Sequence, residues 1–477
     1  MLKKLNRTTA SQAMKYPVKV LQFGKGNFLR GFADWMIDIA NEKTDFGGAI
    51  QIVQTNSTAE DTRFREQEGL YHLVIQGISR GKSFKNVRLI SCVSAVINPF
   101  EDYQSYLRTG ENPDLKFIIS NTTEAGITFD AADDDPHKLP GSFPGKLTTL
   151  LHHRYKYFHA DPAKAVTVFP CELIDKNGEE LQKAVLEYIR HWSLGKDFEN
   201  WITKHTLFCN TLVDRIVPGY PKDANAIWQE TGFEDHLMVA AEPFHLWLIE
   251  APFGDTSRRD NLRVAFPLEQ SGLNVRLVED LAPYRTRKVR ILNGAHTAMV
   301  PVAYLRGLRT VKEAIDDSFT GKFIRRSIAD EIIPTLDLPR VELEEFASDV
   351  MERFQNPSIR HQLKSIALNS ISKFQVRVLP SILEYHKRYG KLADNLLYSL
   401  AALIVFYKGE WRDTATPVND TPEVVAFFKN AWQEGDISLT TERVLGNQHF
   451  WKTDLRKIDG LTSVVERHMR EIATNVP

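Results

Sequence analysis

Short apolar runs alternate with an amphipathic helical pattern over the first 280 or so residues of the chain. Residues 32–40 (FADWMIDIA) carry the spacing of a helix, and six runs rich in β-branched residues indicate strands. These runs cover residues 18–23, 49–54, 71–75, 87–90, 116–119 and 165–169. Strands that alternate with helices in this way predict a mostly parallel sheet whose faces are covered.

The pattern changes after about residue 283, where apolar residues recur at helical spacing and strand-like runs become few. The helical segments cover residues 288–305, 327–333, 340–354, 360–368, 379–388, 395–407, 423–433 and 438–445. We therefore predict an α/β domain over residues 1–280 and a mainly α-helical domain over residues 281–477. The cleft between two such domains is the default position for a binding site.

Composition limits the classes of function. The 477 residues are 43% hydrophobic and 25% charged, and 60 basic against 61 acidic side chains leave a net charge of -1. Nucleic acid and anionic membranes are therefore not expected partners. The apolar stretch at residues 396–407 is too short to span a bilayer, and no apolar segment follows the basic N-terminus, so we expect a soluble cytoplasmic protein. Three widely spaced cysteines predict neither a disulfide framework nor a zinc site.

A glycine-containing turn, residues 24–31 (GKGNFLRG), lies directly between the first predicted strand and the first predicted helix. In dinucleotide-binding folds the first glycine makes the tight turn, and the second lets backbone N–H groups approach the pyrophosphate. Leu29 replaces the third glycine of G-x-G-x-x-G, and Gly31 lies two residues later. The turn predicts a dinucleotide site; an ordinary βα turn without a ligand is the alternative.

Two further strand ends belong to the expected cofactor site. The acid that usually holds the adenosine ribose is absent, because residues 54–56 are Gln-Thr-Asn and the first carboxylates are Glu60 and Asp61. NAD therefore cannot be told from NADP by the usual acid, although no arginine stands at this strand end either, and we expect NAD. Residues 120–126 (SNTTEAG) place small hydroxyl side chains at the end of another strand, where they suit the ribose and nicotinamide. A polar loop that caps the next helix is the alternative.

The sharpest chemical signal is the group Lys288, Asn293 and His296, in the segment RKVRILNGAHT. At about 100° per residue, one helix face can present all three side chains. A lysine whose pKa is lowered by burial and by the neighbouring cations Arg287 and Arg290 could act as a general base on a hydroxyl. An asparagine amide and an imidazole can hold the oxygen, so the group suits alcohol–ketone interconversion. A solvated basic surface is the alternative.

Taken together, these motifs resemble the polyol-specific long-chain dehydrogenases, the mannitol dehydrogenase family. The resemblance is carried in family order by Gly24-x-Gly26-x-Phe28-x-Arg30, residues 122–126 (TTEAG), 213–218 (VDRIVP), 242–244 (EPF) and Lys288-x4-Asn293-x2-His296. It implies a Rossmann-type N-terminal domain, a helical C-terminal domain and metal-independent, NAD-linked oxidoreduction. Lys288 would be the general base, with Asn293 and His296 on the reacting oxygen. The expected cofactor contacts are Phe23, Gly24, Gly26, Asn27, Phe28, Arg30, Gln54, Asn121, Thr122, Thr123 and Glu124.

Within the family, residues 23–30 and 121–126 most resemble members that interconvert tagaturonate and altronate. Leu29 stands where mannitol and fructuronate members tend to carry a histidine. The polyol members have Cys-acid-Asn after a middle strand, whereas this chain reads Cys171-Glu172-Leu173, so the second oxyanion donor is open between Asn177 and Asn210.

The expected substrate is a small sugar acid whose carboxylate needs a cation. Lys373 ranks first because it resembles a substrate-contacting lysine of the mannitol members. Arg377 ranks second, because it lies four residues later, on the same face if this segment is helical. Arg360 is a more distant candidate, and pairing of both cations with acids such as Glu384 is the alternative.

Other functions remain as rivals. Fructuronate reductase and mannitol 2-dehydrogenase are the alternatives among enzymes. A non-catalytic nucleotide-sensing Rossmann protein would keep the glycine turn but has no need of Lys288, Asn293 and His296. His152, His153 and His159 lie close in sequence, but adjacent histidines point to different helix faces, so no metal site is predicted. The sequence does not predict an oligomeric state.

Overall fold

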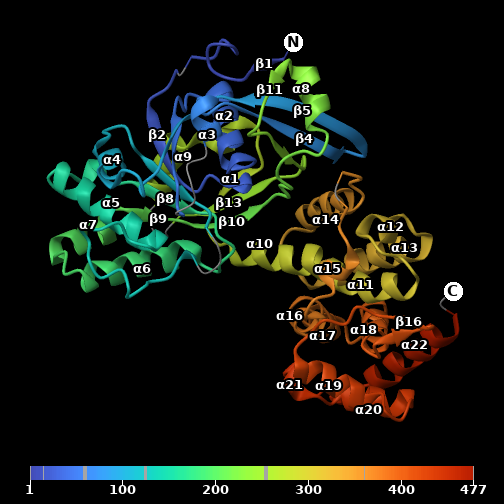
Figure 1. Cartoon of the computed structure of the whole chain (residues 1–477). Helices are drawn as coiled ribbons and strands as arrows, with labels where there is room; N and C mark the ends of the chain where they lie inside the picture. Colours follow the sequence, from blue (N-terminus) through green and yellow to red (C-terminus); the bar gives the residue numbers. More distant parts are fainter. Residues whose placement is uncertain are drawn as a thin grey trace. The chain divides into compact units, whose positions relative to one another are not determined.

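The computed structural model describes residues 2–13, 15–56, 62–122, 126–251, 256–358 and 360–475. The chain forms two compact units, coloured along the sequence in Figure 1. The first unit contains Met1–Gln76 and Ser83–Leu281, and the second contains Gly77–Lys82 and Ala282–Pro477. The sequence pattern did not predict that the short segment Gly77–Lys82 groups with the helical unit.

A six-stranded, fully parallel sheet forms the centre of the first unit, which confirms the predicted α/β class. Its register is set at the middle strand, where Val20 pairs with Ile50 on one side and with Phe117 on the other. In spatial order the strands are β6 (Val93–Ile97), β3 (Ala49–Val53), β2 (Val18–Phe23), β7 (Phe117–Ser120), β8 (Thr167–Pro170) and β9 (Leu207–Phe208).

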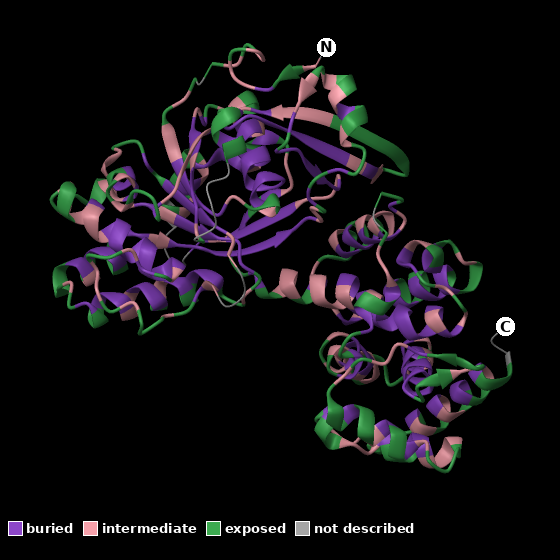
Figure 2. Cartoon of the chain, viewed as in Figure 1, coloured by how far each residue is buried: buried purple, intermediate pink, exposed green. Residues whose placement is uncertain are grey.

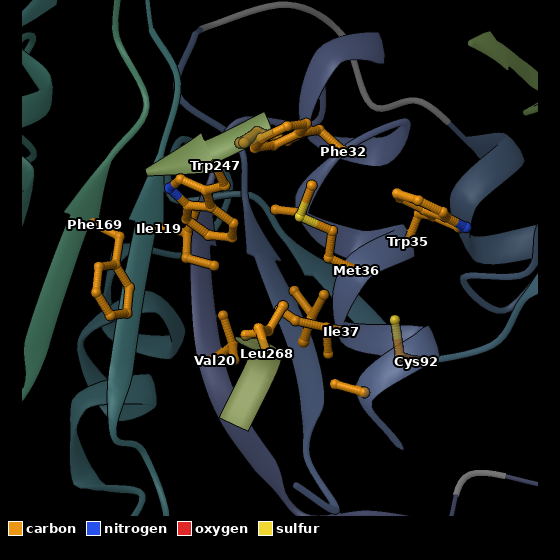
Figure 3. Close-up of a cluster of buried hydrophobic side chains, with 14 of the residues drawn as sticks. Val20, Phe32, Trp35, Met36, Ile37, Cys92, Ile119, Phe169, Trp247 and Leu268 are labelled. Atoms are coloured by element: carbon orange, nitrogen blue, oxygen red, sulfur yellow. The ribbon is translucent and has the colours of Figure 1, made fainter. Parts of the chain in front are cut away.

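Alternate residues of the central strand enter two separate hydrophobic clusters, one on each face of the sheet. Val20 packs with Met36 and Ile37 of α2 (Ala33–Lys43), whereas its neighbour Leu21 belongs to the cluster that contains Leu147 of α5 (Phe143–Tyr157). Figure 3 shows the first cluster, with Trp247 and Leu268 brought in from later in the chain. The helices of this unit are α1 (Asn27–Arg30), α2 (Ala33–Lys43), α3 (Thr62–Glu66), α4 (Tyr103–Arg108), α5 (Phe143–Tyr157), α6 (Asn177–His191), α7 (Lys196–His205), α8 (Ala224–Thr231) and α9 (Thr256–Ala265).

Two of the predicted strand runs lie outside this parallel sheet. Residues 71–75 and 87–90 belong to β4 (Tyr71–Ser79) and β5 (Lys82–Ile90), which form a separate sheet with β12 (Val239–Ala241). The first half of β5 is exposed, so only its last residues carry an apolar signal. A further sheet joins β10 (Asn210–Asp214), β13 (Leu246–Glu250) and β14 (Val275–Val278), and β1 (Lys3–Lys4) pairs with β11 (Phe233–Glu234).

The second unit is mainly helical, as predicted. Its centre is α18 (Asp394–Phe406), which is buried along nearly its whole length (Figure 2). It packs against α11 (Gly294–Leu305) and α22 (Leu461–Asn475). The buried carboxylate of Glu331 accepts hydrogen bonds from the backbone N–H groups of Asn395 and Leu396, so it caps the first turn of α18. No helix in the described ranges is long and apolar enough to cross a membrane.

Two segments of this unit are π-helical, Lys288–Asn293 and Ser327–Ile332. The α-helices are α10 (Ala282–Arg287), α11 (Gly294–Leu305), α12 (Val311–Asp316), α13 (Ser318–Arg326), α14 (Arg340–Phe354), α15 (Leu363–Ile366), α16 (Ser370–Arg377), α17 (Leu379–Tyr389), α18, α19 (Pro422–Ala431), α20 (Ile437–Leu445), α21 (Gln448–Trp451) and α22 (Leu461–Asn475). A small hairpin of β15 (Glu410–Trp411) and β16 (Thr414–Ala415) completes the unit.

Candidate functional site

The glycine turn after β2 has the geometry of a tight strand-to-helix connection. Gly24 has φ +116°, a conformation that favours glycine, and its N–H donates to the Val53 carbonyl at 3.0 Å. A Cβ on Gly24 would lie 3.4 Å from the Asn121 carbonyl oxygen. Gly26 is exposed, with φ -66°, and a Cβ built on it has no atom within 4 Å. The chain therefore leaves open space beside Gly26.

The helix that follows this turn is interrupted at Gly31. The short helix α1 ends there, and α2 begins at Ala33. A Cβ on Gly31 would lie 2.9 Å from Cγ1 of Val217, which is closer than side chains normally approach. Gly31 thus allows the close packing that the third glycine provides in G-x-G-x-x-G turns.

A cavity of about 820 Å³ opens at the glycine turn. Its walls come from the turn and from the segments that follow β3 and β7, where ligands of open α/β sheets bind. They include Gly24, Lys25, Gly26, Asn27, Arg30, Thr55, Asn56, Asn121, Thr122 and Ser142. A second cavity of about 570 Å³ shares Lys25 and Phe64 with the first and is lined by Gln54. Thr123 and Glu124, two of the expected cofactor contacts, lie outside the described residues.

Two expected cofactor contacts, Phe23 and Phe28, pack against aromatic rings of their own unit. Phe23 is fully buried between the rings of Tyr106 and Phe143, so it supports the sheet rather than facing the cavity. Phe28 stacks on Phe32 with centroids 4.9 Å apart. We therefore remove Phe23 from the candidate contacts, whereas the partly buried Phe28 stays a prediction.

Arg30 lines the cavity but is mostly buried, and its guanidinium holds the turn together. It donates to the Lys25 carbonyl at 3.2 Å, to Oδ1 of Asn27 at 2.7 Å and to the Leu237 carbonyl. Its side chain therefore fixes the shape of the glycine turn.

Amide and hydroxyl groups surround the remaining strand ends. Oε1 of Gln54 accepts from Nζ of Lys25 at 2.9 Å, and its Nε2 donates to the Asn56 carbonyl at 2.9 Å. Nδ2 of Asn121 donates to the Cys171 carbonyl at 2.6 Å. These side chains are ordered by the protein itself at the positions where a Rossmann fold binds the two riboses.

Glu172 organises the turn after β7, a role that the sequence analysis missed. Its buried carboxylate accepts hydrogen bonds from Oγ of Ser120 and from both the backbone N–H and the hydroxyl of Thr122, at 2.9–3.1 Å. Burial raises the pKa of Glu172. The acid in the Cys-acid motif was the available signal, but its partners lie about fifty residues away in the sequence.

The two candidates for a second oxyanion donor are both engaged within the chain. Nδ2 of Asn177 donates to the Pro170 carbonyl at 2.9 Å and to the Glu172 carbonyl at 3.0 Å, while its Oδ1 accepts from the Thr211 N–H. Asn210 is tied to α6 in the same way, through its Oδ1 and the N–H groups of Gly178 and Glu179. Both are almost fully buried, so neither amide is open to a substrate, and the expectation for Asn177 is corrected.

In the second unit, Lys288, Asn293 and His296 lie where a π-helix passes into an α-helix. Residues 288–293 form the π-helix, so the α-helical spacing used in the sequence analysis does not apply to them. In a π-helix the backbone hydrogen bonds join residues five apart, which is the sequence separation of Lys288 and Asn293. The amide of Asn293 makes no hydrogen bond to any described residue and is partly exposed.

The cations next to Lys288 differ in their surroundings. Arg287 is buried, pairs with Glu342 at 2.7 Å and lies over the Phe346 ring at 4.4 Å. It is therefore not the uncompensated neighbour of Lys288 that the sequence suggested. Arg290 is partly buried and donates to Oγ of Ser381 at 3.4 Å, and burial lowers its pKa.

The predicted pair of cations, Lys373 and Arg377, lies on the helix α16, so the two residues are four apart on one helix. A Cβ on Gly294 would lie 3.0 Å from the Arg377 carbonyl oxygen, so α16 packs closely against the start of α11. Nζ of Lys373 donates to the Ile366 carbonyl at 3.0 Å. The partly buried Arg377 has no hydrogen bond or ion pair from its side chain within the described chain, and burial lowers its pKa. Glu384 pairs with Arg388 instead.

Two histidines of α5, His152 and His153, contact other side chains of their own unit. The ring of His152 packs on Phe198 at 4.9 Å, and burial lowers the pKa of His152 to about 4. His153 contacts Glu111 at 2.8 Å. Among the residues that the structure describes, no group of three or more His, Cys, Asp or Glu side chains could hold a metal ion.

Comparison with known families covers nearly the whole chain. The family model for the mannitol dehydrogenase Rossmann domain matches residues 18–259, and that for the mannitol dehydrogenase C-terminal domain matches residues 280–473. The chain belongs to the mannitol dehydrogenase family. This confirms the resemblance stated from the motifs.

Within the mannitol dehydrogenase family, the chain is similar over its full length to proteins named altronate oxidoreductase. The one from Bacillus subtilis is 45% identical over 474 residues, which cover 99% of this chain and 96% of the relative. The one from Klebsiella pneumoniae is 44% identical over 471 residues, which cover 97% and 96%.

Two solved structures share the fold. Substrate-free D-sorbitol dehydrogenase superposes with a TM-score of 0.81 at 23% identity, covering 99% of both chains. Mannitol 2-dehydrogenase of Pseudomonas fluorescens gives a TM-score of 0.64 at 22% identity, covering 99% of this chain and 97% of the other. These likenesses support the two-part architecture of the family.

Proposed function

We propose that this chain is an NAD-linked oxidoreductase that interconverts tagaturonate and altronate. The observation that carries the proposal is the 45% identity, over 99% of the chain, to a protein named altronate oxidoreductase. Lys288, Asn293 and His296 supply the chemistry that a ketone–alcohol interconversion needs.

The residues around the glycine turn fit a dinucleotide. A cavity of about 820 Å³ is of the size that small-molecule and cofactor sites have, and the open space beside Gly26 leaves room for a pyrophosphate. We infer that Gly24, Gly26 and Asn27 surround the pyrophosphate and that Gln54 lies at the adenosine ribose. Asn121, Thr122, Thr123 and Glu124 would hold the nicotinamide end. When bound, NADH supplies the hydride that reduces the ketone carbon.

The residues that transfer the proton and hold the oxygen lie in the π-helix Lys288–Asn293 and in the first turn of α11. In reduction, Lys288 donates a proton to the ketone oxygen; in oxidation, it accepts the proton of the hydroxyl. The Asn293 amide and the His296 imidazole donate hydrogen bonds to this oxygen, which favours the negative charge that develops on it. Asn293 suits this role because its amide is not engaged by the described residues around it.

The carboxylate of the substrate distinguishes a uronate from a neutral ketose. We infer that Arg377, with Lys373 on the same face of α16, attracts this carboxylate. Arg377 is a partly buried cation without an acid partner among the described residues, and an anionic ligand would compensate its charge. Lys373 already donates to a backbone carbonyl, so we rank it second.

A panel assay tests the proposal. NADH consumption is measured with tagaturonate, fructuronate and fructose, and the product of the preferred substrate is identified by chromatography against altronate and mannonate standards. We expect the highest kcat/KM for tagaturonate, with altronate as the product. A higher kcat/KM for fructuronate or fructose would contradict the proposed substrate and favour fructuronate reductase or mannitol 2-dehydrogenase.

The same assay tests the cofactor. We expect NADH to be preferred over NADPH, because no described arginine stands at residues 54–56 to hold a 2′-phosphate. Equal or better turnover with NADPH would contradict this preference, whatever the substrate.

A further inference from the structure

A second imidazole, that of His361, lies against His296. The two ring centroids are 5.2 Å apart, with 77° between the ring planes, an edge-to-face contact. Phe354 also packs on the His296 ring, with centroids 4.2 Å apart. His361 therefore lies directly beside a residue proposed to hold the reacting oxygen.

The backbone of His361 is fixed although it lies outside any helix. Its carbonyl accepts from the N–H of Val311 at 3.0 Å, and the following residue, Gln362, pairs with Thr310 in an antiparallel bridge. Leu363 then donates to the Arg309 carbonyl at 2.9 Å. Because hydrogen bonds on both sides hold this segment, the ring of His361 is kept beside His296.

The ring of His361 is partly buried, and in the described part of the chain neither of its nitrogens has a hydrogen bond or an ion pair. Burial lowers the pKa of His361, so the neutral ring predominates at neutral pH. A neutral imidazole offers one N–H donor and one acceptor nitrogen. Partly buried polar groups that find no partner in their own chain are suited to binding an external one.

We propose that His361 binds a hydroxyl group of the sugar-acid substrate, next to the oxygen held by His296. This inference rests on the proposed function. Sugar chains carry oxygens on successive carbons, so two adjacent imidazoles can bind two adjacent oxygens. A hydroxyl donates and accepts, as a neutral imidazole does, whereas a carboxylate only accepts and is better matched by the cations of α16.

Three variants of His361 test the proposal. His361→Phe keeps a ring that can pack on His296 but removes the hydrogen bond, whereas His361→Gln and His361→Asn keep a polar group near the position of one ring nitrogen. We expect His361→Phe to lower kcat/KM for tagaturonate about tenfold, the effect of one lost hydrogen bond. At least one amide variant should recover part of this loss, and the KM for NADH should not change.

Other results would overturn the inference. A kcat/KM for His361→Phe within twofold of the parent excludes the contact, and an equal loss in all three variants leaves His361 as a packing residue only. His449→Phe, at an exposed histidine of the same unit, is the control and should behave like the parent. Thermal unfolding checks that each variant is folded. If His361→Phe does not fold, His361→Leu is compared with His361→Gln in its place. A parent chain that does not turn over tagaturonate would contradict the proposed function, which is a different result.

Discussion

The amine of Lys288 is the group on which the proposed proton transfer depends. We expect Lys288→Ala to lower kcat by roughly two orders of magnitude or more, the usual scale for the loss of a general acid or base. The KM for NADH should barely change, because the glycine turn belongs to the other unit. Asn293→Ala and His296→Ala should also lower kcat, and each combined with Lys288→Ala should be far from additive.

Steady-state kinetics of these variants provide the measurement. Lys387→Ala is a matched control, because the side chain of this lysine of α17 is 79% exposed and its ion pair with Glu384 is long, at 3.6 Å. Activity of Lys288→Ala within a few-fold of the parent would mean that the segment is only a basic surface.

The charge of the substrate gives a separate prediction for α16. Arg377→Met and Lys373→Met should each raise the KM for tagaturonate, by roughly tenfold to a hundredfold where a charge-assisted hydrogen bond is lost. We expect the larger effect for Arg377, because Lys373 already has a backbone partner. A neutral ketose such as fructose should be affected much less.

The change in KM for tagaturonate, compared with that for fructose, shows whether these cations contact the carboxylate or a group that both substrates share. Equal losses on tagaturonate and fructose would contradict the carboxylate assignment. Arg360→Met, at the exposed and more distant candidate, should leave both KM values close to those of the parent.

At the scale of elements, the glycine turn contains one glycine that should matter for NADH binding, Gly26, and one that should matter for stability, Gly31. Gly26→Leu should weaken NADH binding strongly, because the new side chain would fill the open space beside the turn. The Tm of this variant should stay near that of the parent, because the backbone angles at residue 26 suit any residue. Gly31→Leu should lower Tm, because its Cβ would overlap Val217, and overpacking of this kind costs about 1–3 kcal/mol.

Thermal unfolding and NADH fluorescence titration of the two variants measure both effects. Unchanged NADH affinity in Gly26→Leu would argue against a pyrophosphate at this turn. A parent-like Tm in Gly31→Leu would show that the contact with Val217 relaxes easily.

Elements with a strong local pattern could be predicted from the sequence. The strand at residues 18–23 and the helix at residues 340–354 have the observed bounds. Residues 360–368 were expected to be helical, but only Leu363–Ile366 is, because the backbone before it pairs with Thr310. The three-residue strand β12 was missed because it depends on pairing with β4, far away in the sequence.

In the candidate site, too, only residues that are close in sequence could be grouped from the sequence. Lys288, Asn293 and His296 could be grouped because they lie within nine residues of one another. The role of Asn177 depends on Thr211, thirty-four residues away, and the contact of His361 with His296 joins two separate segments. No local pattern reports such contacts, because they arise only when the chain has folded.

For the molecule as a whole, stability should depend on a buried acid in the first unit. Burial raises the pKa of Asp34 to about 7, although Tyr71 donates to its carboxylate at 2.9 Å and Arg30 lies near. In an unfolded chain this pKa is about 3.9. Between these pH values the folded chain binds more protons than the unfolded one, so the free energy of unfolding contributed by Asp34 falls as pH rises towards 7.

Asp34→Asn removes this titration while keeping an oxygen that can accept from Tyr71. The variant should therefore lose less stability than the parent between about pH 4 and pH 7, as measured by urea unfolding of the full chain at several pH values. Asp223→Asn, at an exposed position, is the control. Parallel pH profiles for parent and Asp34→Asn would contradict the prediction.

The π-helix at Lys288–Asn293 limits which insertions and deletions this region can accept in evolution. A π-turn holds one more residue than an α-turn, so it shifts the rotational phase of every later side chain on α11 relative to α10. Deletion of one residue here would restore an ordinary α-helix and rotate His296 about the helix axis relative to Lys288. The number of residues in this segment should therefore tolerate as little variation as the identities of Lys288 and Asn293 do.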